Sequence, residues 1–201
     1  KLQSAWALRL KLLDIETTNA FRVIHGEGDG IPGLIIDYYN KNWVIQAHSS
    51  GIFYQIERIA EAIQANFPKF CETIYCKSSG TLPNTGTDYF LFGTNSETIA
   101  KENNIVFAVN WVEGQKTGFF LDQRENRKLL STFSKGKKVL NTFCYTGGFS
   151  IFCSKYKIST FNTWAYTLTI NNKKNKTIFI ISFINIIVKI GRASCRERVS
   201  S

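Results

Sequence analysis

The feature that most constrains the fold is the stretch Lys138–Ile151, KVLNTFCYTGGFSI, in which apolar runs flank a pair of glycines. This pattern predicts a short buried strand, a tight turn and the first turn of a helix. Gly147 and Gly148 lack a Cβ, so they can adopt positive φ and let a ligand approach the backbone, and the helix offers unpaired N–H groups. Nucleotide-like ligands of α/β proteins bind outside the carboxyl end of such a strand. An ordinary strand-to-helix turn gives the same pattern, so the two glycines alone leave both interpretations open.

Two further stretches lie upstream. Gly26–Asp37 reads GEGDGIPGLIID, and Lys116–Arg124 reads KTGFFLDQR. In this order and at this spacing, the three stretches resemble class I S-adenosylmethionine-dependent methyltransferases, in particular the ribosomal RNA cytosine carbon-5 enzymes of the bacterial large subunit. The resemblance covers roughly residues 4–154. Its matching positions around the glycine pair are Asn141, Phe143, Tyr145, Gly147 and Gly148.

The resemblance implies an α/β fold class with two domains. A small α+β domain is expected in residues 1–95, and the start of a Rossmann-like methyltransferase domain, incomplete, in residues 96–154. The implied cofactor is S-adenosyl-L-methionine, and the implied partner is ribosomal RNA. The residues that the resemblance places at the cofactor are Phe119, Phe120, Gln123, Arg124, Asn141, Phe143, Tyr145, Gly147 and Gly148.

Periodicity predicts the remaining elements. Asp122 stands at an N-cap position with Glu125 three residues later, so the residues alone predict a capping box there. Trp6 is expected to pack in the core, and the strand at 105–109 carries apolar residues on both faces. The expected helices are 4–13, 52–65 and 123–133. The expected strands are 21–25, 34–39, 43–47, 73–76, 105–109 and 139–143, with a hairpin turn at 40–42.

The cysteines and histidines give no catalytic or metal assignment. Methylation of carbon 5 of cytosine uses a thiolate that attacks carbon 6 of the ring, so Cys144 beside the glycine turn is a candidate nucleophile. The family places that cysteine on a strand end far downstream, so we expect Cys144 to be passive and assign no catalytic residue. Cys71 and Cys76 have no second pair, and the only histidines are His25 and His48, so no metal site is expected.

The resemblance stops near residue 154. Residues 155–189 consist mostly of Ile, Asn, Lys, Phe and Tyr and contain no Gly, Pro, Asp or Glu, which is typical of translated AT-rich noncoding or frame-shifted DNA. Ile190–Val199 matches one reading frame of a common sequencing adapter, so we expect residues 155–201 to lie outside the family. The family's next helix, its second strand with a terminal acid, its Asp-Pro-Pro-type motif and its catalytic cysteine are not found there. We therefore expect a fragment of a methyltransferase that is inactive as given.

Net charge does not identify a partner. The chain carries +10, but residues 155–201 hold 9 Lys/Arg and 1 Asp/Glu, so the remaining 16 basic and 14 acidic side chains give residues 1–154 a net charge of only +2. An RNA substrate therefore rests on the resemblance. Lys1–Leu13 is amphipathic and Thr177–Val188 is too short to span a bilayer, so we expect no membrane partner. A reduced, cytoplasmic protein whose true start lies upstream is the simplest interpretation.

Two other functions remain open at this point. The small domain could belong to a noncatalytic RNA- or ribosome-binding module, which cofactor binding would distinguish from the methyltransferase. A nicotinamide-dependent oxidoreductase is disfavoured, because Cys144–Ser150 lacks the G-x-G-x-x-G spacing.

Overall fold

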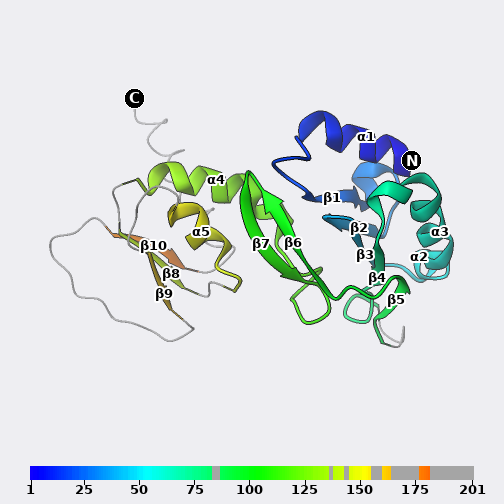
Figure 1. Cartoon of the computed structure of the whole chain (residues 1–201). Helices are drawn as coiled ribbons and strands as arrows, with labels where there is room; N and C mark the ends of the chain where they lie inside the picture. Colours follow the sequence, from blue (N-terminus) through cyan, green and yellow to red (C-terminus); the bar gives the residue numbers. More distant parts are fainter. Residues whose placement is uncertain (83–86, 136–137, 143–144, 155–159, 164–176, 182–201) are drawn as a thin grey trace, which may run out of the picture. The chain divides into compact units, whose positions relative to one another are not determined.

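The computed structural model describes residues 1–82, 87–135, 138–142, 145–154, 160–163 and 177–181 (Figure 1). The chain divides into two compact units, residues 1–122 and residues 123–201, and each is described by itself. These units are not the domains expected from the resemblance, whose boundary at residue 95 stays a prediction. Both units combine helices with a sheet, as the α/β fold class requires.

The first unit is built on a five-stranded sheet in the order β1-β2-β3-β4-β5. Its neighbouring strands are antiparallel except for β3 and β4, whose parallel pairing requires the helical crossover between them. The predicted hairpin is confirmed: Asn40 and Lys41 both have positive φ, 43° and 72°, which suits a two-residue turn between twisted strands. The strands are β1 (Ala20–His25), β2 (Leu34–Tyr39), β3 (Asn42–Ala47), β4 (Thr73–Cys76) and β5 (Tyr89–Phe92).

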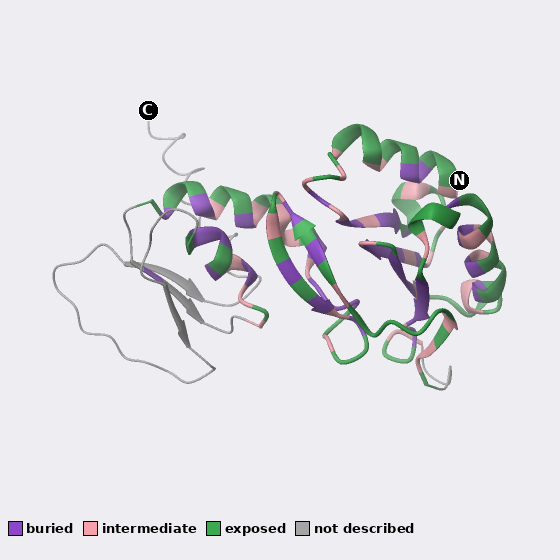
Figure 2. Cartoon of the chain, in the orientation of Figure 1, coloured by how far each residue is buried: buried purple, intermediate pink, exposed green. Residues whose placement is uncertain are grey.

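Helices cover one face of this sheet, and their buried residues face it (Figure 2), where aromatic rings form part of the core. The helices are α1 (Leu2–Leu12), α2 (Ser50–Phe53) and α3 (Ile56–Asn66), and short 3-10 turns lie at Gly26–Asp29 and Pro68–Phe70. Trp6 of α1 is 6% exposed, and its ring centroid lies 5.0 to 5.5 Å from those of Phe21, Tyr38, Trp43 and Phe67. The predicted helix and the packing role of Trp6 are confirmed.

A separate antiparallel hairpin follows, formed by β6 (Glu97–Glu102) and β7 (Ile105–Asn110). Asn103 and Asn104 turn it with φ of 51° and 63°. Phe107 and Val109 are buried, whereas Val106 is 54% exposed. The strand β7 is apolar on both faces, as predicted, but only one face is buried. A two-stranded hairpin leaves the other face exposed. Sequence periodicity missed β5 and β6, since charged and polar residues interrupt β6 and the turn-rich loop precedes β5.

The second unit contains α4 (Arg124–Phe133), β8 (Lys138–Thr142) and α5 (Gly148–Ser154), close to the predicted helix and strand. The predicted capping box is wrong. A 3-10 turn, Leu121–Gln123, precedes α4 and makes Gln123 its N-cap residue, with no side-chain cap bond. Asp122 lies inside that 3-10 turn.

Two strands fall in the segment where we expected none: β9 (Thr160–Thr163) and β10 (Thr177–Ile181). Both pair in parallel with β8, in the order β10-β8-β9, so β8, α5 and β9 form a βαβ unit. The absence of a second strand was thus a wrong expectation, because β-branched and aromatic residues suit a strand wherever a partner edge is offered. β9 ends at Thr163, which is not acidic. The foreign origin of residues 155–201 stays a prediction.

Candidate functional site

The turn between β8 and α5 is the first part of the candidate site. Gly147 has a φ of +73° and accepts, at its carbonyl oxygen, the first helical hydrogen bond from the N–H of Ile151 at 3.0 Å. The predicted positive φ is confirmed for Gly147. Gly148 does not use this freedom: it has no positive φ, is the first residue of α5 and is buried. Of the two glycines, only Gly147 thus uses the left-handed backbone.

Position 147 favours glycine because of its backbone conformation and not because of steric crowding. A Cβ built there meets no described atom within 4 Å, so the space beside this backbone is open. An L-residue at this φ would be strained, because its Cβ crowds the following carbonyl oxygen. An open, glycine-lined backbone at the carboxyl side of a central parallel strand suits a flat nucleoside-like ligand.

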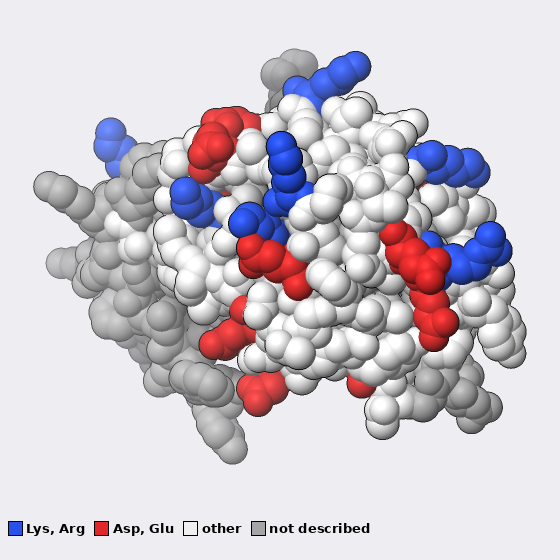
Figure 3. All heavy atoms as spheres, turned by 45° about the vertical axis from the view of Figure 1, so that its right-hand side comes forward, with Lys and Arg blue, Asp and Glu red and all other residues white. Residues whose placement is uncertain are grey.

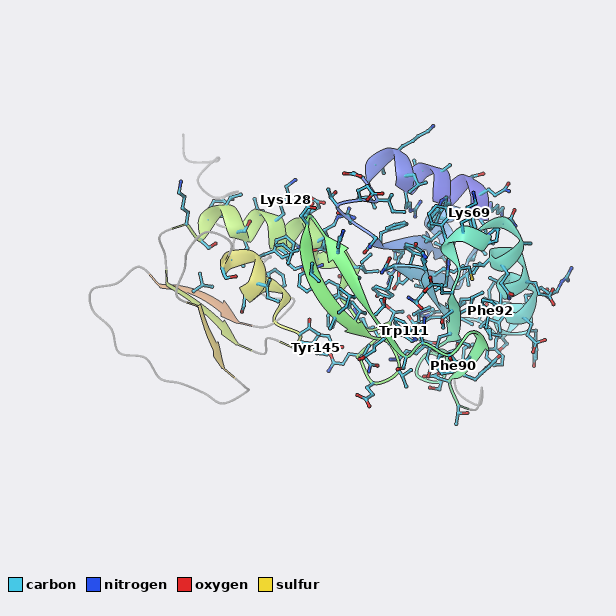
Figure 4. The ribbon with its side chains drawn as sticks, in the orientation of Figure 1. Lys69, Phe90, Phe92, Trp111, Lys128 and Tyr145 are labelled. Carbon is cyan, nitrogen blue, oxygen red and sulfur yellow. The ribbon has the colours of Figure 1, made fainter. Side chains whose placement is uncertain are left out.

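Tyr145, which is labelled in Figure 4, also has a left-handed backbone. Its φ is +48°. Bulky residues rarely adopt this conformation, and such outliers gather at functional sites. The backbone of Asn141 lies in β8, paired in register with Asn162 of β9 and Ile180 of β10. Phe143 and Cys144 lie outside the described residues.

At the start of α4, the predicted residues Gln123 and Arg124 both form hydrogen bonds with residues of the same helix. Gln123 Oε1 accepts a hydrogen bond from Asn126 Nδ2 at 2.9 Å, and Arg124 Nε donates to Glu125 Oε1 at 3.1 Å. Because Glu125 is exposed, this ion pair contributes little stability. The sequence did not predict that Arg127 of the same helix is buried, with 2% exposure. Its guanidinium carbon lies 5.9 Å from the ring centroid of Phe149 in α5.

In the first unit, the other predicted pair, Phe119 and Phe120, follows a buried glycine. Gly118 has a φ of +110°, and a Cβ there would lie 2.8 Å from the carbonyl oxygen of Asn110, so only glycine fits. Phe119 is buried with its ring centroid 4.9 Å from that of Phe107. Lys116 Nζ lies 4.8 Å from the Phe120 centroid, which places a cation over that ring.

Polar side chains of the sheet hold this segment, and sequence reasoning missed them. Asp37 is fully buried and accepts hydrogen bonds from Arg22 Nε at 2.8 Å and from Thr117 Oγ1 at 2.6 Å. Tyr39 Oη lies 3.0 Å from Thr117 Oγ1. Burial raises the pKa of Tyr39 well above its ordinary value, so its hydroxyl stays protonated. The only sequence signal was an acid embedded in an apolar strand.

The same unit carries a groove of about 790 Å³. Lys77 of this groove donates to the backbone carbonyls of Trp111, Val112 and Gly114, and burial lowers its pKa. His25 also lines it, with Nδ1 at 3.3 Å from an Arg22 guanidinium nitrogen. The charged and titratable side chains of the groove are Arg22, His25, Glu27, His48, Lys77, Asp88 and Lys116.

Cys153 is buried in α5, as expected, and burial raises the pKa of its thiol. In the part of the chain that the structure describes, no cluster of three or more His, Cys, Asp or Glu side chains is arranged to hold a metal ion. Within the same residues, no helix has the length and apolarity needed to cross a membrane.

Comparison with known proteins identifies the group of proteins to which this chain is related. Residues 82–164 match the family of S-adenosylmethionine-dependent methyltransferases. The ribosomal RNA large subunit methyltransferase I of Tolumonas auensis is 36% identical over 157 residues, which cover 76% of this chain and 40% of that protein. The chain is homologous to S-adenosylmethionine-dependent methyltransferases. It spans about 40% of the length of the curated relatives that it matches.

Solved structures agree on the fold. A Streptococcus mutans protein provisionally classed as an S-adenosylmethionine-dependent methyltransferase has a TM-score of 0.70 at 27% identity, and the match covers 80% of this chain and 42% of that one. A second structure, of a provisionally classed methyltransferase in complex with S-adenosylhomocysteine, has a TM-score of 0.70 at 23% identity. The match covers 96% of this chain and 53% of that structure's chain. The predicted Rossmann-like α/β fold class is confirmed.

Proposed function

We propose that this chain carries the S-adenosylmethionine-binding turn of a methyltransferase that acts on large-subunit ribosomal RNA, at carbon 5 of cytosine. The observation that carries the cofactor assignment is the turn at Gly147, which has positive φ, open space beside its backbone and a place between β8 and α5 of a βαβ unit. The family match of residues 82–164 includes this turn.

The residues of the turn fit the proposed cofactor in chemical kind. When bound, S-adenosylmethionine supplies an electrophilic methyl group. This chain would bind it through the backbone at Gly147 and through the side chains already named from the resemblance, Phe119, Phe120, Gln123, Arg124, Asn141, Phe143 and Tyr145. Aromatic rings and backbone amides suit an adenosyl group, which is planar and rich in hydrogen-bonding atoms.

Two observations bear on an RNA substrate. The relatives are named as ribosomal RNA methyltransferases, and the groove of the first unit is lined by the basic side chains of Arg22, Lys77 and Lys116 together with the acids Glu27 and Asp88. On the face in Figure 3, basic and acidic side chains are interspersed rather than gathered. We therefore expect few phosphate contacts and a shallow dependence of affinity on salt. Carbon 5 of cytosine as the target rests on the resemblance alone.

We expect the chain as given to bind the cofactor without transferring its methyl group to RNA. Methylation at carbon 5 requires a nucleophile at carbon 6, and no residue here is assigned that role. Cys144 is expected to be passive. Methyl transfer by the purified chain that Cys144→Ala abolishes would contradict both expectations.

A noncatalytic RNA-binding module is the second candidate, because the groove lies wholly in the first unit. Binding of S-adenosylhomocysteine separates it from the first candidate. It should be titrated calorimetrically into the wild-type chain, Gly147→Val and the control Gly51→Ala. A Cβ at Gly51 is equally unhindered, and the backbone there lacks positive φ.

Gly147→Val should weaken binding at least tenfold and lower the melting temperature by only a few degrees, because the branched side chain occupies the open space. Gly51→Ala and Cys144→Ser should bind like the wild type. If the wild-type chain does not bind, or if Gly147→Val binds equally well, the assignment of this turn fails.

A further inference from the structure

The inference concerns the polar face of the five-stranded sheet. Side chains alternate along β2, so Ile36 and Tyr38 join the aromatic core while Asp37 and Tyr39 face the opposite side. Arg22 of β1 stands opposite Asp37 in register. Asp37 and Tyr39 are fully buried, whereas the Arg22 side chain is 30% exposed.

A buried carboxylate is a costly way to join two strands. Its transfer from water is offset here by two bonds from Arg22, at 2.8 and 3.0 Å, and one from Thr117 at 2.6 Å. Apolar residues of similar volume often stabilise a protein as well as such a pair does. The arrangement is therefore better explained by the geometry that it imposes than by its contribution to stability.

That geometry is imposed on the segment Thr117–Phe119. Thr117 Oγ1 is held from two sides, by Asp37 and by Tyr39, and the Tyr39 hydroxyl also lies 3.5 Å from the carbonyl oxygen of Phe119. Between them, Gly118 fits closely against Asn110. The backbone of this segment is thus fixed at both ends, immediately before Phe120 and the 3-10 turn at Leu121–Gln123.

We propose that Asp37, Arg22 and Tyr39 are positioning residues that hold Thr117–Phe120 in the conformation required to bind S-adenosylmethionine. The inference rests on the proposed function, in which Phe119 and Phe120 border the cofactor. None of the three residues needs to touch the ligand. They raise the fraction of molecules in which the segment has the competent shape, and apparent affinity scales with that fraction.

Thr117→Val tests the proposal, because it keeps the shape of the side chain and removes the hydroxyl that both partners hold. Thr117→Ser restores that hydroxyl. Asp29→Asn is the matched control: Asp29 accepts two bonds from Arg9, at 2.7 and 2.6 Å, in another nearly buried pair that does not contact the segment. Tyr39→Phe removes one of the two holds and serves as a second test should Thr117→Val not fold.

The measurements are calorimetric titration with S-adenosylhomocysteine, thermal melting, and hydrogen exchange of the amides of residues 118–122. Thr117→Val should weaken binding roughly tenfold and speed exchange in the segment, since it removes both contacts of the hydroxyl, with Asp37 and with Tyr39, and the loss of such hydrogen bonds corresponds to a factor of about that size. Tyr39→Phe should do the same to a smaller extent, and Thr117→Ser should bind within about threefold of the wild type. Asp29→Asn should lower the melting temperature with unchanged affinity.

The outcomes separate this inference from the proposed function. Wild-type binding with an equal affinity for Thr117→Val and Tyr39→Phe would overturn the positioning role and leave the cofactor assignment standing. Equal weakening by Asp29→Asn would reduce the effect to general destabilisation and would also overturn it. No binding by the wild-type chain would overturn the proposed function, and this inference with it.

Discussion

The two faces of the five-stranded sheet are packed by different kinds of interaction. On one face, Trp6 and its neighbouring rings dock α1 by apolar burial, which is strong and tolerant of small shifts. On the other, Asp37 and Tyr39 dock Thr117 by hydrogen bonds that require fixed distances and angles, beside the stacked rings of Tyr39 and Trp111. Apolar packing thus supplies most of the stability, while the polar contacts set the shape of a segment that the proposed function uses.

The largest effect should come from the apolar face. Trp6→Ala should lower the free energy of unfolding by about 3–5 kcal/mol, because it removes a ring that contacts several others. Urea denaturation followed by fluorescence measures it. Amide exchange in residues 118–122 should rise no more than in the rest of the unit. A loss below about 1.5 kcal/mol would show that the ring cluster does not dominate stability.

Alkaline titration should give the next largest effect. Burial raises the pKa of Tyr38, on the apolar face, to about 12 from an ordinary 10, so the folded state keeps the proton that the unfolded state loses. The stabilisation is full below pH 10 and is lost as pH rises towards 12. The wild type should lose about 2–3 kcal/mol relative to Tyr38→Phe across that window. Parallel stability curves for the two proteins would contradict the buried phenol.

Asp37→Asn should have the smallest effect on stability of the three. The change leaves Arg22 without its charge partner, but a guanidinium that is 30% exposed can be solvated, so we expect a loss of about 1–2 kcal/mol. Chemical denaturation measures it. A loss equal to that of Trp6→Ala would remove the distinction between the two faces.

The difference between the faces also explains what the sequence could predict. Helix and strand periodicity identified α1, α4, the β2–β3 hairpin and the burial of Trp6, because each depends on local pattern and apolar content. It missed the partnership of Asp37 with Thr117, which are 80 residues apart and whose types are common at exposed positions. It also missed β9, because the composition of residues 155–189 lacks the turn residues by which strands are usually delimited.

The candidate site divides in the same way. The glycine pair indicated a turn, and Gly147 adopts the expected backbone, because positive φ is a property that glycine alone supplies freely. The helix start was predicted one residue early at Asp122, because a 3-10 turn has no distinct sequence signature. The roles of the aromatic residues came from the resemblance, and their binding function stays a prediction.

Photolabelling tests the central claim most directly. The chain is irradiated with methyl-tritiated S-adenosylmethionine, with and without excess S-adenosylhomocysteine, and its tryptic peptides are separated and counted. We predict competed label in the peptide of residues 139–155, which contains the turn at Gly147. Label confined to peptides of residues 1–116, or label that excess S-adenosylhomocysteine does not displace, would contradict a cofactor site at the carboxyl end of β8.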